Sequence, residues 1–593
     1  MERLEASSTV RPGGKESEGV VTEGTPTNGT HGLRLARLAP WAGWGAVGVA
    51  LALLRPASPF EWDEVLYQRA LDGYDVARHS PHPPGAPAFV GAAGLVRLAV
   101  GDPQLALQLV TVACALAALL LVYALARTEG GERTTAFAGA GVLAAMPAFL
   151  FYSNVGLSDV PATAGLLAAM LACLRAVDEP RRLPVAAGVA ALALGVRPQL
   201  IPALLPIGLA AVVIAVRQRA WKHLAVAFGV GVTVCAAIWL PAVLATGPER
   251  FRAALADHSR YWIEVEKKVR LPGAPLGKVL QHWLLDPLGT PPTAVAFWML
   301  AVIGAVAWWR SGRRRLVVVA GGTALVYLTS AAFAMNFNAS VRYVLPTLAL
   351  AALLAGGVLA IRGRWVRAAL GVVLAAWAGV GLGWGWPVLA KRREPAPVWS
   401  ALTWVTEHYD PRRTTVVFDG ILRPHAQYVL GRAGFNPELV EGDRVYPAEL
   451  RPRGDVLLVT PWPVPGSEVL LERDWPSPVL RQLTMGRYTR CTVLRAPPGD
   501  GPLFSPGFRS EERGLVLWGT GRVQLGGGPN LATRVCPLTF PVTLELPGSP
   551  PTVVERGSCR DVALTPGAAG AIALRAPAHL HALLKPMLFR PVS

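Results

Sequence analysis

The sequence predicts a polytopic α-helical membrane protein of about eleven spans, followed by C-terminal α/β and β-sandwich modules outside the cytoplasm. Of its 593 residues, 52% are hydrophobic and only 16% are charged, whereas soluble proteins carry about 25% charged residues. Its mean hydropathy is +0.38. Long apolar runs recur over the first two thirds of the chain, with Arg clusters between alternate runs. Such alternation is typical of a multispanning protein with basic cytoplasmic loops.

The N-terminal residues 1–33 are rich in Gly, Ser, Thr and Glu and show no hydrophobic periodicity. We expect them to be a disordered cytoplasmic tail. Arg34 and Arg37 precede the first apolar run, so the positive-inside rule predicts a cytoplasmic N-terminus. No small-x-small cleavage site follows that run, and a cleavable signal peptide is therefore not expected.

The membrane domain is predicted to occupy residues 34–390. The segment Ala88–Val100 is apolar but about 13 residues long, short of the ~20 needed to cross a bilayer, so we expect a helix in the outer interface. Basic clusters follow every inward span, and the odd count places the C-terminal modules outside. The predicted spans are Leu38–Leu54, Gln104–Ala126, Thr135–Phe151, Ala162–Ala176, Leu183–Val196, Leu200–Val216, Leu224–Leu244, Thr293–Trp309, Val317–Phe333, Val344–Ile361 and Ala368–Leu389.

Beyond the last span the sequence pattern changes. An amphipathic helix at Pro397–His408 and buried strands at Thr414–Phe418 and Asp455–Thr460 predict a small α/β domain over residues 391–500. Short alternating runs separated by Gly and Pro predict a β-sandwich over 501–593. Outside the cytoplasm a Cys536–Cys559 disulfide could form, which leaves Cys491 unpaired in this region.

The net charge of +18 does not indicate a nucleic-acid partner, because the Arg residues sit in short clusters between apolar runs. No CxxC or His/Cys zinc spacing occurs. The glycines of Gly519–Gly528 lack the strand–turn–helix context of a phosphate loop. We therefore expect no nucleotide cofactor.

Carboxylates gather in two predicted outer loops. Asp63 and Glu64 follow the first span, and Asp159 precedes Pro161 in the second loop. Adjacent residues on a helix diverge by ~100°, so only one of Asp63 and Glu64 can face a given partner. Converging carboxylates could take a proton from an acceptor hydroxyl or hold a divalent metal ion. The alternatives are a solvated loop for the first pair and a helix cap for Asp159.

Cationic side chains lie at the same predicted depth. Arg197 and Arg342 stand at the outer ends of apolar segments, where Arg either snorkels to headgroups or binds a lipid phosphate through its planar fork. His82 and His258 are candidate loop contacts, and His258 is a candidate metal ligand with Asp63 and Asp159. A His beside Pro-Pro-Gly, however, is more often a structural hydrogen-bonder. Tyr261 and Lys267 in the third outer loop are further candidate contacts.

Four motifs together resemble one family. Trp62-Asp63-Glu64-Val65-Leu66-Tyr67 and His82-Pro83-Pro84-Gly85-Ala86-Pro87 resemble the first outer loop of GT-C glycosyltransferases. Ser158-Asp159-Val160-Pro161 resembles their second-loop acidic motif, and Arg342-Tyr343-Val344-Leu345-Pro346 their late Arg-Tyr-x-x-Pro motif. More narrowly, the chain is similar to the protein O-mannosyltransferase and lipid A aminoarabinose transferase group, with its RgtA/B/C/D-like members. The resemblance covers residues 38–389 in order and spacing.

This resemblance implies an inverting transferase that uses a polyprenyl-phosphate sugar donor at the outer leaflet. It makes Asp63 the catalytic base or acceptor-binding carboxylate, with Glu64 and Asp159 in support, around a divalent metal ion if one is used. Arg342, Tyr343 and Arg197 would hold the donor phosphate. The abundance of Ala, Gly, Arg and Pro suggests a GC-rich bacterium, and hence an inner-membrane location.

Two other function classes fit the sequence less well. A secondary transporter or lipid flippase places ionisable residues near mid-bilayer, whereas these spans are almost free of acids. A non-catalytic membrane-anchored carbohydrate-binding protein would leave the Asp63 and Asp159 arrangement without purpose. We therefore predict an integral-membrane glycosyltransferase with an acceptor on the outer face.

Overall fold

The computed structural model describes residues 42–261, 277, 280–335, 341–435 and most of 440–591. The chain divides into two compact units, residues 1–47 and 48–593. The predicted disordered tail 1–33 lies outside the described residues, and the first unit is described only from residue 42, where it is helical.

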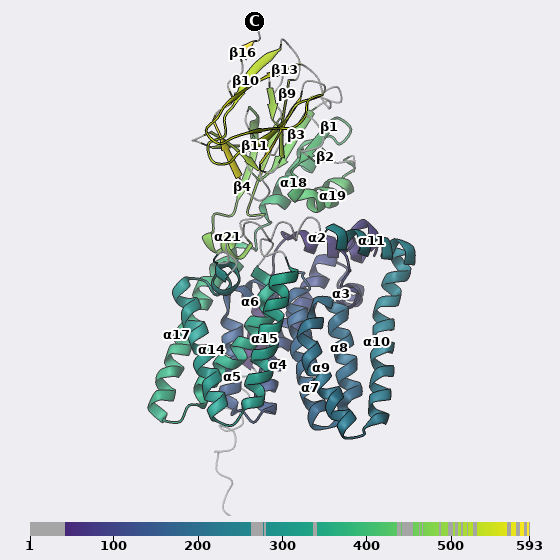
Figure 1. Ribbon diagram of the computed structural model, residues 1–593, viewed down its shortest axis with the longest axis vertical. Helices are drawn as coiled ribbons and strands as arrows, with labels where there is room; N and C mark the ends of the chain where they lie inside the picture. Colours follow the sequence, from purple (N-terminus) through teal and green to yellow (C-terminus); the bar gives the residue numbers. More distant parts are fainter. Residues whose placement is uncertain are drawn as a thin grey trace, which may run out of the picture. The chain divides into compact units, whose positions relative to one another are not determined.

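Eight helices in the described part of the chain are long and apolar enough to cross a membrane. Figure 1 shows them running side by side in a bundle. All eight coincide with predicted spans, which confirms a polytopic helical membrane domain. They are α4 (Pro103–Thr128), α7 (Asp159–Asp178), α9 with its preceding 3₁₀ turn (Pro198–Arg217), α10 (Trp221–Thr246), α14 (Pro291–Arg310), α15 (Arg314–Ala334), α16 with its flanking 3₁₀ turns η7 and η8 (Val341–Ala360), and α17 (Arg364–Lys391).

The other three predicted spans are short or broken. The helix Ala42–Leu53 and α8 (Leu183–Val196) are both shorter than a full crossing. The predicted span Thr135–Phe151 is two helices, α5 (Arg133–Ala145) and α6 (Pro147–Tyr152), separated by Met146 in an extended conformation. Pro147 causes this break, because proline lacks an N–H and disfavours the α conformation in the residue before it. The count of eleven spans therefore stays a prediction.

Ion pairs connect the basic inter-helix turns at one end of the bundle. Arg315 contacts both Glu129 and Asp178, and Arg367 Nη1 lies 3.8 Å from Glu132 Oε2. These residues come from four different inter-helix turns, which must therefore share one end. The sequence also predicts these four turns on one side of the membrane, so the structure agrees with the predicted topology.

The opposite end carries three helices that do not cross: α2 (Trp62–Asp72), α3 (Pro87–Val100) and α11 (Pro248–Tyr261). Helix α3 packs against α4 and α8. Its Phe89 is buried, whereas Leu95 and Leu98 are 72% and 86% exposed. An apolar helix with one buried and one exposed face is what the interfacial position predicts.

The loop between α2 and α3 turns sharply at Gly85. This residue has φ +115°, and a Cβ added there would lie 2.1 Å from the hydroxyl oxygen of Tyr74. Only glycine combines that backbone conformation with so close an approach. The His82-Pro83-Pro84-Gly85 segment thus leads the chain into α3.

The predicted α/β elements are confirmed at their predicted bounds: α18 (Pro397–His408), β1 (Thr414–Phe418) and β3 (Asp455–Thr460). The mixed sheet has the order β2-β1-β3-β5-β4. Strand β3 pairs with β1 in the parallel direction and with β5 in the antiparallel direction. Its other elements are α19 (Arg423–Arg432), β2 (Val440–Glu441), β4 (Glu468–Asp474), α21 (Pro478–Thr484) and β5 (Arg490–Arg495).

The last part of the chain forms three antiparallel sheets. Their orders are β12-β11-β14-β9-β6, β13-β10-β16 and β15-β8-β7. The strands are β6 (Pro502–Phe504), β7 (Phe508–Glu511), β8 (Gly514–Trp518), β9 (Thr520–Leu525), β10 (Leu531–Val535), β11 (Val542–Glu545), β12 (Thr552–Val554), β13 (Arg560–Leu564), β14 (Ile572–Arg575), β15 (His581–Leu584) and β16 (Arg590–Pro591).

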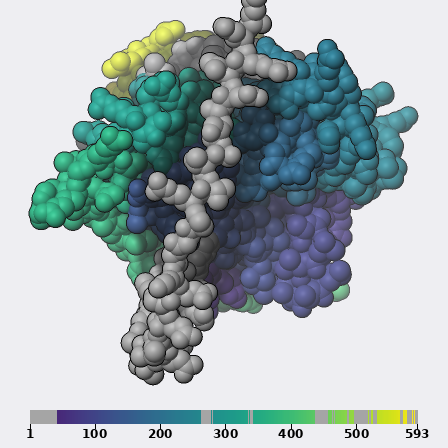
Figure 2. Space-filling model, turned by 90° about the horizontal axis from the view of Figure 1, so that it is seen from below, coloured from purple at the N-terminus to yellow at the C-terminus, as the bar shows by residue number. Residues whose placement is uncertain are grey.

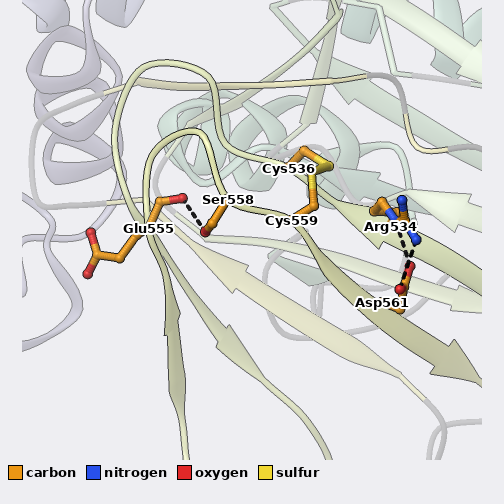
Figure 3. Close-up of a disulfide and its surroundings, with 6 residues drawn as sticks. All are labelled: Arg534, Cys536, Glu555, Ser558, Cys559 and Asp561. Atoms are coloured by element: carbon orange, nitrogen blue, oxygen red, sulfur yellow. Dashed lines mark hydrogen bonds and ion pairs between the residues drawn. A yellow bond between two sulfur atoms is a disulfide. The ribbon is translucent and has the colours of Figure 1, made fainter.

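Cys536 and Cys559, for which the sequence left a disulfide open, are bonded to each other (Figure 3). It joins the chain just after β10 to the chain just before β13, beside the Arg534–Asp561 ion pair. A single hydrophobic core contains Val417 and Leu458 of the mixed sheet together with Leu544 and Ile572 of the later strands. The two predicted C-terminal modules therefore pack as one body.

The last turns of helix α2 contact the C-terminal region through a hydrogen bond and an ion pair. Arg69 Nη1 donates a 3.1 Å hydrogen bond to Gln427 Oε1 on α19. Asp72 accepts a 2.8 Å hydrogen bond from Arg97 of α3 and forms an ion pair with Arg432 of α19. The helix that carries Asp63 thus touches both the membrane domain and the α/β sheet region.

Candidate active site

An ion cluster joins α2, α7 and the 3₁₀ turn η7 (Val341–Val344) at the end of the bundle away from the basic turns. Arg342 Nη2 donates a 2.5 Å hydrogen bond to Asp63 Oδ2. The same guanidinium lies 3.6 Å from Asp159 Oδ2 and 3.9 Å from Glu61 Oε2. The buried guanidinium of Arg342 therefore contacts three carboxylates, which come from two distant parts of the sequence.

Arg197 adds a second cation to this cluster. It follows α8 directly and forms an ion pair with Asp159. The ring of Tyr343 faces both guanidinium groups, with its centroid 5.2 Å from the Arg197 Cζ and 5.4 Å from the Arg342 Cζ. The structure thus brings together the predicted residues Asp63, Asp159, Arg197, Arg342 and Tyr343.

Asp159 is not a helix cap. It is the first residue of α7, where Ser158 occupies the N-cap position without a side-chain hydrogen bond. Its carboxylate is 3% exposed and is paired with two arginines. The capping alternative that the sequence left open is therefore wrong.

Asp63 is the accessible acid of the cluster. Its side chain is 29% exposed, whereas Glu61 and Asp159 are buried. Burial would raise the pKa of Asp63, but the Arg342 guanidinium outweighs that effect and holds the pKa below its usual value. Asp63 is therefore a carboxylate at neutral pH, and it can meet a bound molecule.

Glu64 points elsewhere, as the ~100° divergence of neighbouring helix residues requires. It is fully buried, and its two carboxyl oxygens accept hydrogen bonds from the backbone N–H groups of Phe60 and Gly156 at 3.2 and 3.1 Å. Burial raises its pKa to about 7, although these two hydrogen bonds oppose the rise. Glu64 therefore connects α2 to the loop before α7 through these hydrogen bonds.

Tyr67 lies one turn after Asp63 and so on the same face of α2. Its hydroxyl group is 2.9 Å from Ser158 Oγ, and its ring packs edge-on against Phe89 of α3. These contacts fix the face of α2 that presents Asp63.

Three histidines meet beside Asp63. The Nδ1 atoms of His79 and His82 are 3.1 Å apart, and the His258 ring lies edge-on to His82 with centroids 4.6 Å apart. Burial lowers the pKa of His82 to about 4, against the attraction of Asp63. His82 interacts electrostatically with Asp63 and contacts His258, and a role for either histidine in the site stays a prediction. Of the other loop candidates, Tyr261 ends α11 but its side chain is not described, and Lys267 lies outside the described residues.

These residues do not fit a divalent metal ion. Among the described residues, no group of three or more His, Cys, Asp or Glu side chains is placed to hold one. Asp63 and Asp159, two of the three predicted ligands, both contact Arg342, whose positive charge would repel a metal ion. The metal set predicted from Asp63, Asp159 and His258 is not assembled.

Arg392, at the end of α17, supports the site and was missed in the sequence. It is fully buried and donates hydrogen bonds to the Phe151 carbonyl at 2.8 Å and to Asn154 Oδ1 at 2.9 Å. Asn154 in turn donates to the carbonyls of Leu51 and Leu54. One sequence feature could have indicated it. The predicted membrane topology puts Arg392 on the outer side, where basic residues are uncommon.

Residues 81–244 match the family described as dolichyl-phosphate-mannose-protein mannosyltransferase. The GT-C resemblance is confirmed. The matched segment begins beside His82 and contains Asp159 and Arg197, and it ends before Arg342. The match supports a membrane glycosyltransferase.

Solved structures of similar folds include two of ArnT from Cupriavidus metallidurans. The form bound to undecaprenyl phosphate has a TM-score of 0.49 at 13% identity, covering 79% of this chain and 98% of that chain. The apo form has a TM-score of 0.46 at 15% identity, covering 77% and 98%. The Archaeoglobus fulgidus oligosaccharyltransferase complex with Zn and sulfate has a TM-score of 0.39 at 12% identity, covering 92% and 97%. No curated protein sequence matches the chain.

Proposed function

We propose that this protein is an inverting membrane glycosyltransferase that moves a sugar from a polyprenyl-phosphate donor to an acceptor hydroxyl on the extracytoplasmic face. Asp63 is its base. The observation that carries this proposal is the cluster in which one accessible carboxylate, Asp63, lies beside two largely buried arginines, Arg197 and Arg342.

The reaction is a single displacement. The acceptor oxygen forms a bond to the anomeric carbon of the sugar, and the bond from that carbon to the phosphate oxygen breaks with its electron pair going to the phosphate. The acceptor proton passes to the Asp63 carboxylate. Attack from the side opposite the phosphate inverts the anomeric configuration, and holding both reactants in line supplies much of the rate.

Arg342 and Arg197 neutralise the leaving phosphate in this scheme. A planar guanidinium binds phosphate oxygens through two parallel hydrogen bonds. Arg342 hydrogen-bonds Asp63 in the structure, so a phosphate that takes over this guanidinium also weakens its hold on Asp63. The pKa of Asp63 then rises and the carboxylate becomes a stronger base. Donor binding would thus increase the basicity of the Asp63 carboxylate.

An apolar groove between the spans suits the donor's hydrocarbon tail. It measures about 880 Å³ and lies among α7, α8, α9 and α10, with Ala190, Phe228 and Trp239 in its wall. Ala190 precedes Arg197 by seven residues, or ~10 Å along a helix. A polyprenyl chain whose phosphate is bound at Arg197 can therefore continue into this groove.

The disulfide supports an extracytoplasmic position for the C-terminal region. Disulfides form and persist in oxidising compartments and are rare in the cytosol, and Cys536 is bonded to Cys559. Together with the basic turns at the opposite end, which the positive-inside rule assigns to the cytoplasm, the disulfide supports an extracytoplasmic position for Asp63.

A transfer assay with the purified full-length protein tests the proposal. Undecaprenyl-phosphate sugars are supplied as donors, and Asp63→Asn is compared with Glu249→Gln, which changes an exposed acid on α11 at the same end of the bundle. We expect Asp63→Asn to lower transfer by about 100-fold or more with an unchanged unfolding temperature, and Glu249→Gln to transfer normally. Full transfer by Asp63→Asn would refute the assignment.

A further inference from the structure

A second hollow lies at the basic end of the bundle, remote from the ion cluster. It has a volume of about 610 Å³ between α14 and the turn that leads from η8 (Gly356–Ala360) into α17. Figure 2 views the molecule from this end, with α14 in teal and α17 in green. Its lining includes Val302, Val306, Arg310, Ser311, Ile361 and Arg362.

The wall of this hollow is apolar and faces outward from the bundle. Val302 and Val306 lie one turn apart on α14 and are 63% and 45% exposed. Ile361 and Ala360 line it from the other side. Because α14 and α17 are membrane spans, these exposed side chains lie where hydrocarbon chains surround the protein.

The rim of the hollow carries positive charge and hydrogen-bond donors. Arg310 ends α14, Ser311 follows it, and Arg362 stands in the turn before α17. Among the described residues that line the hollow, none is acidic. The nearby acids of this end are paired with other arginines: Glu129 and Asp178 with Arg315, Glu132 with Arg367, and Glu179 with Arg181 and Arg182.

Among the described residues, neither Arg310 nor Arg362 forms an ion pair with a carboxylate, so both charges are open to an outside anion. Two tryptophans mark the depth at which they lie. Trp309 is 44% and Trp365 is 75% exposed, with the guanidinium groups of Arg314 and Arg364 over their rings. Exposed tryptophans concentrate at the level of the lipid headgroups.

We propose that this hollow binds one anionic phospholipid of the surrounding leaflet. Its phosphate contacts Arg310 and Arg362, Ser311 donates to a headgroup oxygen, and one acyl chain follows Val302, Val306 and Ile361. Basic pockets between spans at the cytoplasmic side suit anionic headgroups. The apolar wall makes a lipid, rather than a soluble phosphate, the fitting ligand.

Native mass spectrometry of the detergent-purified full-length protein tests this site. Phosphatidylglycerol and phosphatidylcholine with the same acyl chains are titrated separately, and glycerol 3-phosphate is the soluble anion. The Arg310→Gln/Arg362→Gln variant removes the charges. Val302→Trp fills the hollow and leaves the charges in place. Arg133→Gln removes an exposed arginine that begins α5 at the same end and does not line the hollow.

We expect one phosphatidylglycerol to bind the unchanged protein and Arg133→Gln about tenfold more tightly than phosphatidylcholine, since phosphate held by arginine is a charge-assisted contact. The double variant and Val302→Trp should both lose that preference. Three outcomes would overturn the proposal: equal binding of both lipids, an unchanged preference in Val302→Trp, or competition by glycerol 3-phosphate at the same concentration as the lipid. Unfolding temperatures of all variants establish that each is folded.

Discussion

Arg342 donates a 2.5 Å hydrogen bond to Asp63, a residue 279 positions earlier in the chain. This contact connects the start of a membrane span with the first turn of a helix at the membrane surface. Asp159 and Glu61 also lie within 4 Å of the same guanidinium, so Arg342 contacts all three carboxylates of the cluster.

Replacing Arg342 should weaken donor binding more than turnover of the bound donor. Arg342→Ala removes the charge, and Arg342→Lys keeps it but loses the planar fork. We expect the dissociation constant for undecaprenyl phosphate to rise about tenfold or more in the alanine variant and by less in the lysine variant. Equilibrium binding and single-turnover transfer measure the two effects separately.

The control for this experiment is Arg250→Ala, which removes an arginine of α11 that pairs with Asp75 at the same end of the bundle. Its donor affinity should not change. An unaltered dissociation constant in both Arg342 variants would show that the donor phosphate binds elsewhere.

Glu64 should make stability depend on pH. Its pKa is about 7 in the folded protein, above the usual ~4.3 of a free glutamate, so the folded state holds this proton more tightly than the unfolded state. The stability contributed by the Glu64 proton is therefore complete below pH ~4 and is lost as the pH rises to about 7, by up to ~4 kcal/mol. The unfolding temperature should fall correspondingly between pH 5 and pH 8.

Glu64→Gln tests that assignment. The amide does not titrate, and its nitrogen cannot accept either of the N–H groups of Phe60 and Gly156. We expect a lower unfolding temperature at pH 5 and a flatter pH profile than in the unchanged protein. A profile as steep as that of the unchanged protein would assign the pH dependence to other groups.

Arg392 and Arg393 form a matched pair of neighbouring arginines. Arg392 is fully buried with two hydrogen-bond acceptors, and Arg393 is exposed. Arg392→Met leaves the Phe151 carbonyl and Asn154 without their donor, which should lower the free energy of unfolding by about 3 kcal/mol or more. Arg393→Met should change it by no more than ~0.5 kcal/mol. Equal effects in chemical or thermal unfolding would contradict the assigned role.

Gly85→Ala should distort the loop that lines the site. The added Cβ would meet the Tyr74 hydroxyl oxygen at 2.1 Å, in a backbone conformation with φ +115°. We expect a lower unfolding temperature and reduced transfer. Tyr74→Phe removes the clashing oxygen but not the backbone strain, so the double variant should recover part of the loss. No recovery in the double variant would point to the backbone alone.

Hydrophobic length and periodicity were sufficient to predict most of the helices and the first strands of the C-terminal region. They failed where a local rule overrode them. Met146 and Pro147 sit inside an apolar run, and the proline breaks a helix that hydropathy treats as continuous. The shared core of Val417 and Leu544 was also unpredictable, because sheet packing joins residues that no periodicity relates.

The residues of the ion cluster were candidates in the sequence, but their arrangement was not predicted. Polar residues at span ends pointed to Asp63, Asp159, Arg197 and Arg342. The choice between Arg342 and a metal ion as the partner of Asp63 depends on how α2 is rotated about its axis, which no sequence pattern indicates. Glu64 shows the same dependence: a rotation of ~100° separates a carboxylate in the cluster from one that braces a loop.

Helix α2 is held by charge at both of its ends. Asp63 in its first turn is bonded to Arg342, and Asp72 at its last residue is bonded to Arg97 and to Arg432 of α19. The two acids are nine residues apart, roughly 13 Å along the axis. Because α2 is bonded to Arg342 at one end and to α19 at the other, a displacement of α19 would be transmitted along α2 toward Asp63. Through α2, the C-terminal region is therefore connected to Asp63.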